Sequence, residues 1–252
     1  FKQRQDIMRH ILIAAAAALM TCACSSPPKQ SDDTNVGTST KIEGDSTLYG
    51  LACEGCTDSV LVFLPGTGGD PVTYDIIDAT LHGRVIGKPK TGDWVAVVLD
   101  SSNPKKGDMV INLDELKGQW VELVYPTLRD RSSNIDVSDS EQAELDSLLR
   151  ERMKPIEMGF ALKRHYVAQP IGTFRAMSRS DDDPVVFPVP KRYVGWHIYN
   201  GQLVLQIRPT RDDSLHERLN ICDTAQLLLL TRDSLRLRFS DGPRGYYRKA
   251  DS

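Results

Sequence analysis

The sequence lacks a large excess of charge of either sign. Its 31 lysine and arginine residues stand against 34 aspartate and glutamate residues, which gives a net charge of −3. A mildly acidic surface offers no electrostatic footprint for nucleic acid, so we expect no nucleic-acid partner. Long apolar runs are equally scarce. Outside residues 11–20, no run approaches the length of a membrane-spanning helix, and the rest of the chain is expected to be soluble.

Patterns typical of catalytic and metal sites are also missing. The chain has no Gly-x-Ser-x-Gly nucleophile turn, and its residues suggest no set of acid, base and nucleophile. His165 and His197 are not at metal-ligand spacing, and the pair Cys53-x-x-Cys56 lacks the second pair that a zinc site would require. We therefore predict that the protein is not an enzyme and holds neither a metal nor a cofactor.

Residues 8–24 have the pattern of a secretion signal. The basic start at Arg9 precedes the apolar run, and small residues and cysteines follow it. The run has the length of a signal-peptide core and is too short to span a bilayer. The segment resembles the lipobox of bacterial lipoproteins, which implies lipidation of Cys22 or Cys24. An ordinary cleaved secretory signal is the alternative. Residues 1–24 are thus assigned to a signal peptide, and Met8 is expected to be its true translation start.

Residues 25–42 are expected to be a flexible tether. They are rich in serine, threonine, proline, aspartate and glycine, and they bury too little apolar surface to offset the entropy of ordering. Together with the leader, they predict a protein anchored to the cell envelope through lipid. Outer-membrane delivery is favoured, because neither Ala23 nor Ser25 is the aspartate that retains well-studied bacterial lipoproteins at the inner membrane.

Residues 43–112 are predicted to form a small antiparallel β domain. Short strand-like runs alternate with turns rich in glycine and proline, and no convincing amphipathic helix lies between them. An OB-like or SH3-like barrel, or a sandwich, fits this pattern. The expected strands cover residues 47–52, 59–64, 72–77, 84–86 and 94–99.

The motif Cys53-Glu-Gly-Cys56 lies between the first two of these strands. Redox pairs normally open a helix, whose N-terminus lowers the thiol pKa, but Asp58 and a β-rich run follow here. We therefore expect either a local disulfide between Cys53 and Cys56 or a reduced turn. The compartment implied by the leader would allow a disulfide to persist.

The second half of the chain contains an ordered set of strand motifs. Leu203 and Leu205 alternate with polar residues, as in a half-buried strand, and Asn200-Gly201 is a strong hairpin signal. The set resembles the lipocalin-like domain of bacterial lipoproteins, which implies an eight-stranded up-and-down β-barrel over residues 113–252. The matching pieces are Gly118-Gln-Trp120 and residues 159–163, 194–205, 227–237 and 246–248.

The resemblance also implies roles for individual side chains. Arg248 is expected to stack over Trp120 and close one end of the barrel, as an architectural pair. Four aromatic residues are candidates to line a ligand cavity, although packing in the core is the commoner role for such side chains. These candidates are Phe160, Phe174, Trp196 and Tyr199.

A helix is predicted within the insertion at residues 127–158. Ser138-x-x-Glu141 is a capping box, and Pro155 limits the helix at its far end. The helix could cover the barrel mouth as a lid or simply pack against the barrel, and packing is favoured. Its apolar face would consist of Leu145, Leu148, Leu149 and Met153.

These expectations describe a mainly β, lipid-anchored protein whose barrel binds a small apolar or amphipathic ligand without catalysis. The alternative is a structural or assembly lipoprotein, whose barrel is filled by side chains and whose surface binds a partner protein. A well-formed internal cavity favours ligand binding, whereas a solid core with an exposed apolar patch favours assembly.

Overall fold

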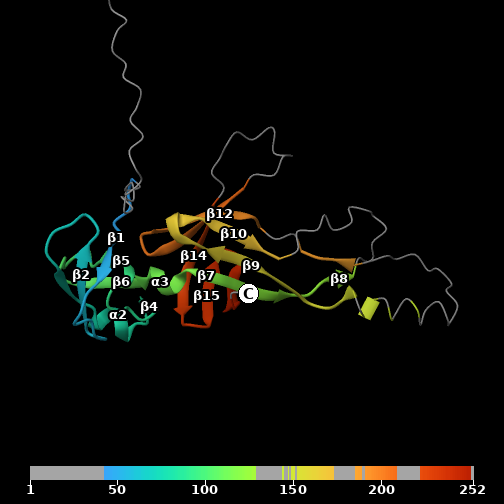
Figure 1. Cartoon of the computed structure of the whole chain (residues 1–252), viewed down its shortest axis with the longest axis horizontal. Coiled ribbons are helices and arrows are strands. Elements are labelled where there is room, and N and C mark those ends of the chain that lie inside the picture. Colours follow the sequence, from blue (N-terminus) through green and yellow to red (C-terminus); the bar gives the residue numbers. More distant parts are fainter. Residues whose placement is uncertain are drawn as a thin grey trace, which may run out of the picture. The chain divides into compact units, whose positions relative to one another are not determined.

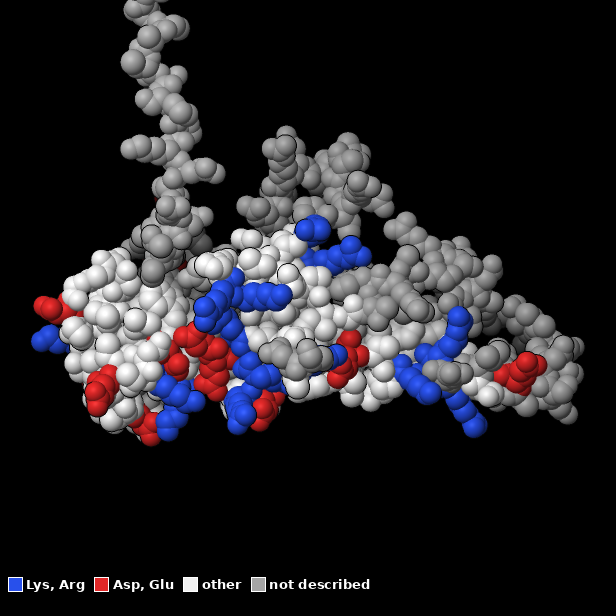
Figure 2. Space-filling model, in the orientation of Figure 1, with Lys and Arg blue, Asp and Glu red and all other residues white. Residues whose placement is uncertain are grey.

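The computed structural model describes residues 43–128, 144, 147, 149–150, 152–172, 185–188, 191–208 and 222–250 (Figure 1). The predicted leader, the tether, Cys22, Cys24 and Phe174 lie outside these residues. Within them, no helix is both long and apolar enough to cross a membrane. On the face seen in Figure 2, basic and acidic side chains lie interspersed, in keeping with the small net charge.

The described chain is mainly β and contains a six-stranded sheet in its N-terminal part. Neighbouring strands pair antiparallel, except that β4 runs parallel to β6. The strands, in spatial order, are β3 (Val72–Asp75), β2 (Val60–Pro65), β1 (Leu48–Ala52), β5 (Trp94–Leu99), β6 (Gly107–Asn112) and β4 (Val85–Ile86).

This sheet departs from the expected antiparallel pattern in two places. The short helix α2 (Ile77–Leu81) follows β3, so the strand predicted to reach Ile77 ends earlier. The backbone N–H of Ile77 donates to the Asp75 carboxylate, and Ala79 is buried. The helix carries the chain toward β4, which then joins β6 in parallel. β6 itself is absent from the strands that the sequence predicted.

The second sheet has eight antiparallel strands, which pair in chain order except that the third and fourth form its two edges. The last strand pairs with the first. An isolated β-bridge between Val167 and Gly195 links the two edges of the sheet, so the barrel is nearly closed. Its strands are β7 (Gly118–Val124), β9 (Ile156–Leu162), β10 (Ala168–Ile171), β12 (Tyr193–Tyr199), β13 (Gln202–Ile207), β14 (Cys222–Leu230), β15 (Ser234–Phe239) and β16 (Gly242–Arg248).

Short elements connect the sheets and extend the barrel. Helix α3 (Leu113–Leu116) joins β6 to β7, and the Asn112 side chain caps it by accepting from the N–H groups of Asp114 and Glu115. A 3₁₀ turn, η1 (Arg164–Tyr166), joins β9 to β10, and a two-stranded ribbon pairs β8 (Thr127–Leu128) with β11 (Val185–Val186). In the insertion, residues 144, 147, 149–150 and 152 are helical, while the capping box lies outside the described residues.

Two apolar clusters form the core. One belongs to the N-terminal sheet and contains Leu61, Phe63 and Val97. The other fills the barrel and also takes in Ile111, α3 and neighbouring residues of the N-terminal sheet. Residues on both sides of the predicted boundary at residue 112 therefore share one buried cluster.

Candidate ligand-binding site

One end of the barrel is filled by Trp120 and Arg248. The Trp120 side chain is completely buried, and its Nε1–H donates to the Leu116 carbonyl at 2.8 Å. The Arg248 guanidinium carbon lies 4.2 Å from the centre of a Trp120 ring. Its nitrogens donate to three carbonyl oxygens, at 2.5–2.7 Å, so this end holds its shape without a ligand. These acceptors belong to Glu115, Lys117 and Arg232.

The middle of the barrel is filled by side chains. Phe160 packs edge-on against Tyr193, with ring centres 5.6 Å apart, and against Tyr246, at 5.2 Å. The remaining volume is occupied by apolar side chains that are almost fully buried, among them Leu162, Trp196, Ile198, Leu203, Leu205, Leu235 and Leu237.

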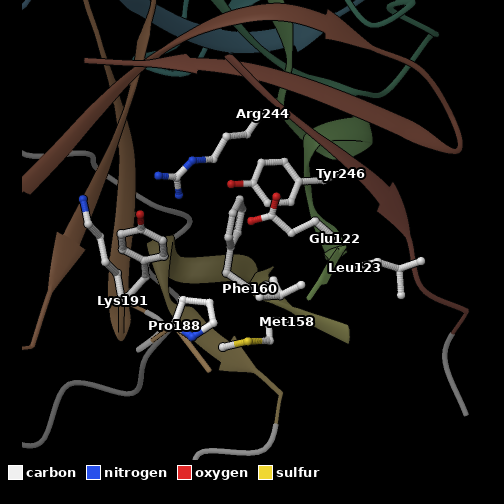
Figure 3. A pocket seen from close by; sticks show the side chains of 11 residues that line it. Glu122, Leu123, Met158, Phe160, Pro188, Lys191, Arg244 and Tyr246 are labelled. Atoms are coloured by element: carbon white, nitrogen blue, oxygen red, sulfur yellow. The ribbon is translucent and has the colours of Figure 1, made fainter. Parts of the chain in front are cut away.

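The opposite end contains a recess of about 410 Å³, where the apolar filling stops above Phe160 (Figure 3). Strand alternation positions its polar groups: Glu122 follows Trp120 by two residues, Tyr246 precedes Arg248 by two, and Arg244 precedes it by four. The recess is lined by Glu122, Leu123, Val124, Met158, Gly159, Phe160, Pro188, Lys191, Tyr193, Arg244 and Tyr246.

Both basic side chains in the recess have acidic partners. Lys191 Nζ lies 2.7 Å from an Asp223 carboxylate oxygen, and the Tyr193 hydroxyl donates to the same oxygen at 2.7 Å. Arg244 forms an ion pair with Asp241 at 2.5 Å and lies over the Phe239 ring. The positive charges of the recess are therefore balanced within the protein.

Glu122 is different. Its side chain is half-buried and faces the recess, and it forms no hydrogen bond or ion pair within the part of the chain that the structure describes. Burial raises the pKa of this carboxyl, while the positive charge of Arg244 acts in the opposite direction. Burial also raises the pKa values of the Tyr193 and Tyr246 hydroxyls, which remain neutral donors at physiological pH.

The four aromatic residues predicted to line a ligand cavity lie in different places. Phe160 lines the floor of the recess. Trp196 belongs to the core, where its Nε1–H donates to the Lys163 carbonyl at 3.0 Å. Tyr199 lies away from the recess and donates to the Glu43 carbonyl at 3.4 Å, and Phe174 is outside the described residues.

The sequence prediction missed the polar residues of the recess. Glu122, Tyr193 and Arg244 lack any recognisable motif. The signal that identifies two of them is the period of two, because Glu122 shares a strand face with Trp120, and Arg244 shares one with Arg248. A charged residue on the inner face of a barrel strand is unusual enough to mark a candidate site.

Cys53 and Cys56 are not bonded to one another in the structure, and a disulfide between them in an oxidising compartment stays a prediction. The Cys56 sulfur accepts a hydrogen bond from the Val62 N–H at 3.4 Å, which holds the turn against β2 without a covalent link. Cys56 also borders a second recess, of about 450 Å³, in the N-terminal sheet. Among the described residues, no group of three or more potential ligand side chains is arranged to hold a metal ion.

Comparisons of the chain with protein-family models, with curated proteins and with solved structures gave no match. A functional hypothesis therefore depends on the chemistry of the recess. That chemistry combines an apolar floor, three aromatic side chains, paired cations and one carboxylate that has no hydrogen bond or ion pair to the described residues.

Proposed function

We propose that the protein is a non-catalytic binding protein that holds a small apolar or amphipathic molecule in the barrel recess. The observation that carries this proposal is the recess itself: one end of the barrel is packed, and the other opens above Phe160. Small-molecule sites are typically concave and largely apolar, with a few convergent polar groups, and volumes of roughly 300–1,000 Å³. The recess combines these properties.

The proposal includes a lipocalin-like identity for the barrel. Its support is the up-and-down strand order together with the stacking of Arg248 on Trp120 at the closed end. An OB-like or SH3-like character for the N-terminal sheet is a further hypothesis. The lipid anchor, the envelope location and the outer-membrane address rest on residues 8–24 alone, where Cys22 or Cys24 would carry the lipid.

Native mass spectrometry of the gently purified protein, combined with titration of 1-octanol followed by NMR, tests the binding function. We expect saturable binding that Val124→Trp abolishes, because Val124 lines the recess and the larger ring occupies it. Thr224→Trp places the same ring at an exposed position of β14 and should leave binding unchanged. Equal binding by both variants, or none by the wild type, would exclude the recess as the site.

A structural or assembly role is the second candidate. It is favoured by the filled middle of the barrel and by exposed apolar side chains near the end of β7, namely Leu123, Tyr125 and Leu128. A partner protein bound there would be lost from Tyr125→Ser and retained by Val124→Trp. Loss of 1-octanol binding in Val124→Trp, with 1-octanol binding retained in Tyr125→Ser, would support the small-molecule site.

A further inference from the structure

The charges around the barrel recess do not cancel. Among the described residues, the carboxylates of Asp223 and Asp241 neutralise Lys191 and Arg244, respectively. The Glu122 carboxylate forms no ion pair with any residue that the structure describes, although the positive charge of Arg244 acts on it through space. A half-buried charge is costly unless it is paired, so the recess favours an occupant that brings one positive charge.

The walls around Glu122 also suit a cation. Phe160, Tyr193 and Tyr246 line the same recess, and both tyrosines contact Phe160 in edge-on geometry. Aromatic faces attract ammonium groups, most strongly where water is excluded. Tyr246 and Glu122 line the same recess and interact electrostatically, so one cationic group can meet both.

An apolar surface completes the site. Met158 and Phe160, both almost fully buried, form its floor, and Val124 and Pro188 add apolar surface. A ligand with an aliphatic chain would bury that chain against them at roughly 25 cal/mol per Å² of apolar area. The recess thus presents the Glu122 carboxylate to a charged group and an apolar floor to a hydrocarbon chain.

We propose that the recess selects a cationic amphipathic molecule, with a protonated amine against Glu122 and an apolar body on Met158 and Phe160. This inference rests on the proposed binding function and names the ligand class of the same site. An anionic ligand would have to displace Asp241 from Arg244 or Asp223 from Lys191, and it would approach the Glu122 carboxylate.

Three probes of equal chain length test the selectivity: octylammonium, 1-octanol and octanoate, each titrated into the full chain at pH 8 by calorimetry. Alkylammonium groups titrate near the lysine value, about 10.4, so the amine is charged at this pH. We expect octylammonium to bind about tenfold more tightly than 1-octanol, the effect of one charge-assisted contact. Octanoate should bind more weakly than either.

The variant Glu122→Gln keeps the shape of the side chain and removes its charge. It should weaken octylammonium binding about tenfold and leave 1-octanol binding unchanged, which also reports that the variant is folded. Glu157→Gln is the matched control, since Glu157 lies on β9 and pairs with Lys249 outside the recess. That variant should bind all three probes as the wild type does.

The pH dependence provides an independent readout. As the pH is lowered from 8 to 4, octylammonium keeps its charge while Glu122 gains a proton. The affinity for octylammonium should therefore fall as the pH is lowered. The other titratable groups that line the recess are Arg244 and Tyr246 on β16, Tyr193 on β12, and Lys191. Asp241 is paired with Arg244, and Asp223 with Lys191. No described histidine lines the recess, so the fall should follow the carboxyl.

The outcomes separate the two proposals. If 1-octanol binds and Val124→Trp blocks it, but octylammonium shows no preference or Glu122→Gln has no effect, the cation inference is wrong and the binding function stands. Tighter binding of octanoate than of octylammonium also overturns the inference. If none of the three probes binds, the proposed binding function itself is wrong.

Discussion

At the scale of single residues, Arg248 shows how many contacts one side chain contributes to the stability of this barrel. Its guanidinium lies over Trp120 and donates to three main-chain carbonyls. These acceptors belong to α3, to Lys117 between α3 and β7, and to the β14–β15 turn, so one planar group ties the α3–β7 connection to that turn. Lysine has a single rotatable ammonium and cannot reproduce this fork.

We expect Arg248→Lys to lower the free energy of unfolding by about 3 kcal/mol, from lost hydrogen bonds and weaker stacking. Urea denaturation followed by tryptophan fluorescence measures this loss. Arg238→Lys, at an exposed position on β15, should change stability by less than about 0.5 kcal/mol. Equal effects at the two positions would exclude the proposed role of Arg248.

Glu122 predicts a pH-dependent stability that needs no ligand. Its raised pKa means that the folded state holds the carboxyl proton more tightly than the unfolded chain does. The wild type therefore loses stability as pH rises through the raised pKa. Glu122→Gln avoids this loss and should be more stable than the wild type at pH 7, and the difference should shrink as pH falls through the raised pKa and vanish below the ordinary value of 4.5.

Urea titrations at pH 4 and pH 7 check this sign. Glu157→Gln should behave in the opposite way, because Lys249 and Tyr247 lower the pKa of the Glu157 carboxyl and stabilise its charged form. That variant should lose stability at pH 7, relative to the wild type, and regain it in acid. The same trend in both variants would mean that burial does not control the Glu122 carboxyl.

At the scale of elements, alternation predicted most strands, and local exceptions to it were missed. Trp196 illustrates the limit: a register shift between Tyr193 and Gly195 changes which side chains of β12 point inward, and no sequence pattern marks it. Helix α2 has five residues, too few for a helical period to be read. The parallel pairing of β4 with β6 depends on the path through this helix.

The pairing of β7 with β9 requires a glycine. Gly159 lies opposite Val121, and a Cβ at Gly159 would come within 2.0 Å of the Trp120 carbonyl oxygen. Backbone cannot rotate away as a side chain can, so Gly159→Ala should cost about 3 kcal/mol and lower the melting temperature by several degrees.

Gly245, on β16 of the same sheet, is the matched control. A Cβ there meets nothing within 4 Å, and Gly245→Ala should be neutral or slightly stabilising, because it restricts the unfolded chain. Calorimetry of both variants decides the point. Similar melting temperatures for the two would show that close approach at Gly159 carries no special cost.

At the scale of the whole molecule, the sequence placed a boundary at residue 112, whereas the buried cluster continues across it. Ile111 and Leu116 lie on either side of that boundary and pack in the same cluster as the barrel residues. The sequence pattern predicts which face of a strand is buried, but not which other sheet buries it. Contacts of this kind are decided by tertiary packing, which no local period reports.

The shared cluster predicts cooperative unfolding of the two sheets. Leu116 is fully buried in that cluster, and Leu116→Ala should cost about 3 kcal/mol through the cavity that it leaves. Hydrogen exchange in increasing urea should show the amides of β5 and β13 losing protection at the same midpoint, with both midpoints lowered together in the variant. Leu61→Ala, in the cluster confined to the N-terminal sheet, should also lower both, since one transition governs the molecule. If Leu61→Ala unfolds β5 while β13 stays protected, the two sheets are energetically separate despite their common core.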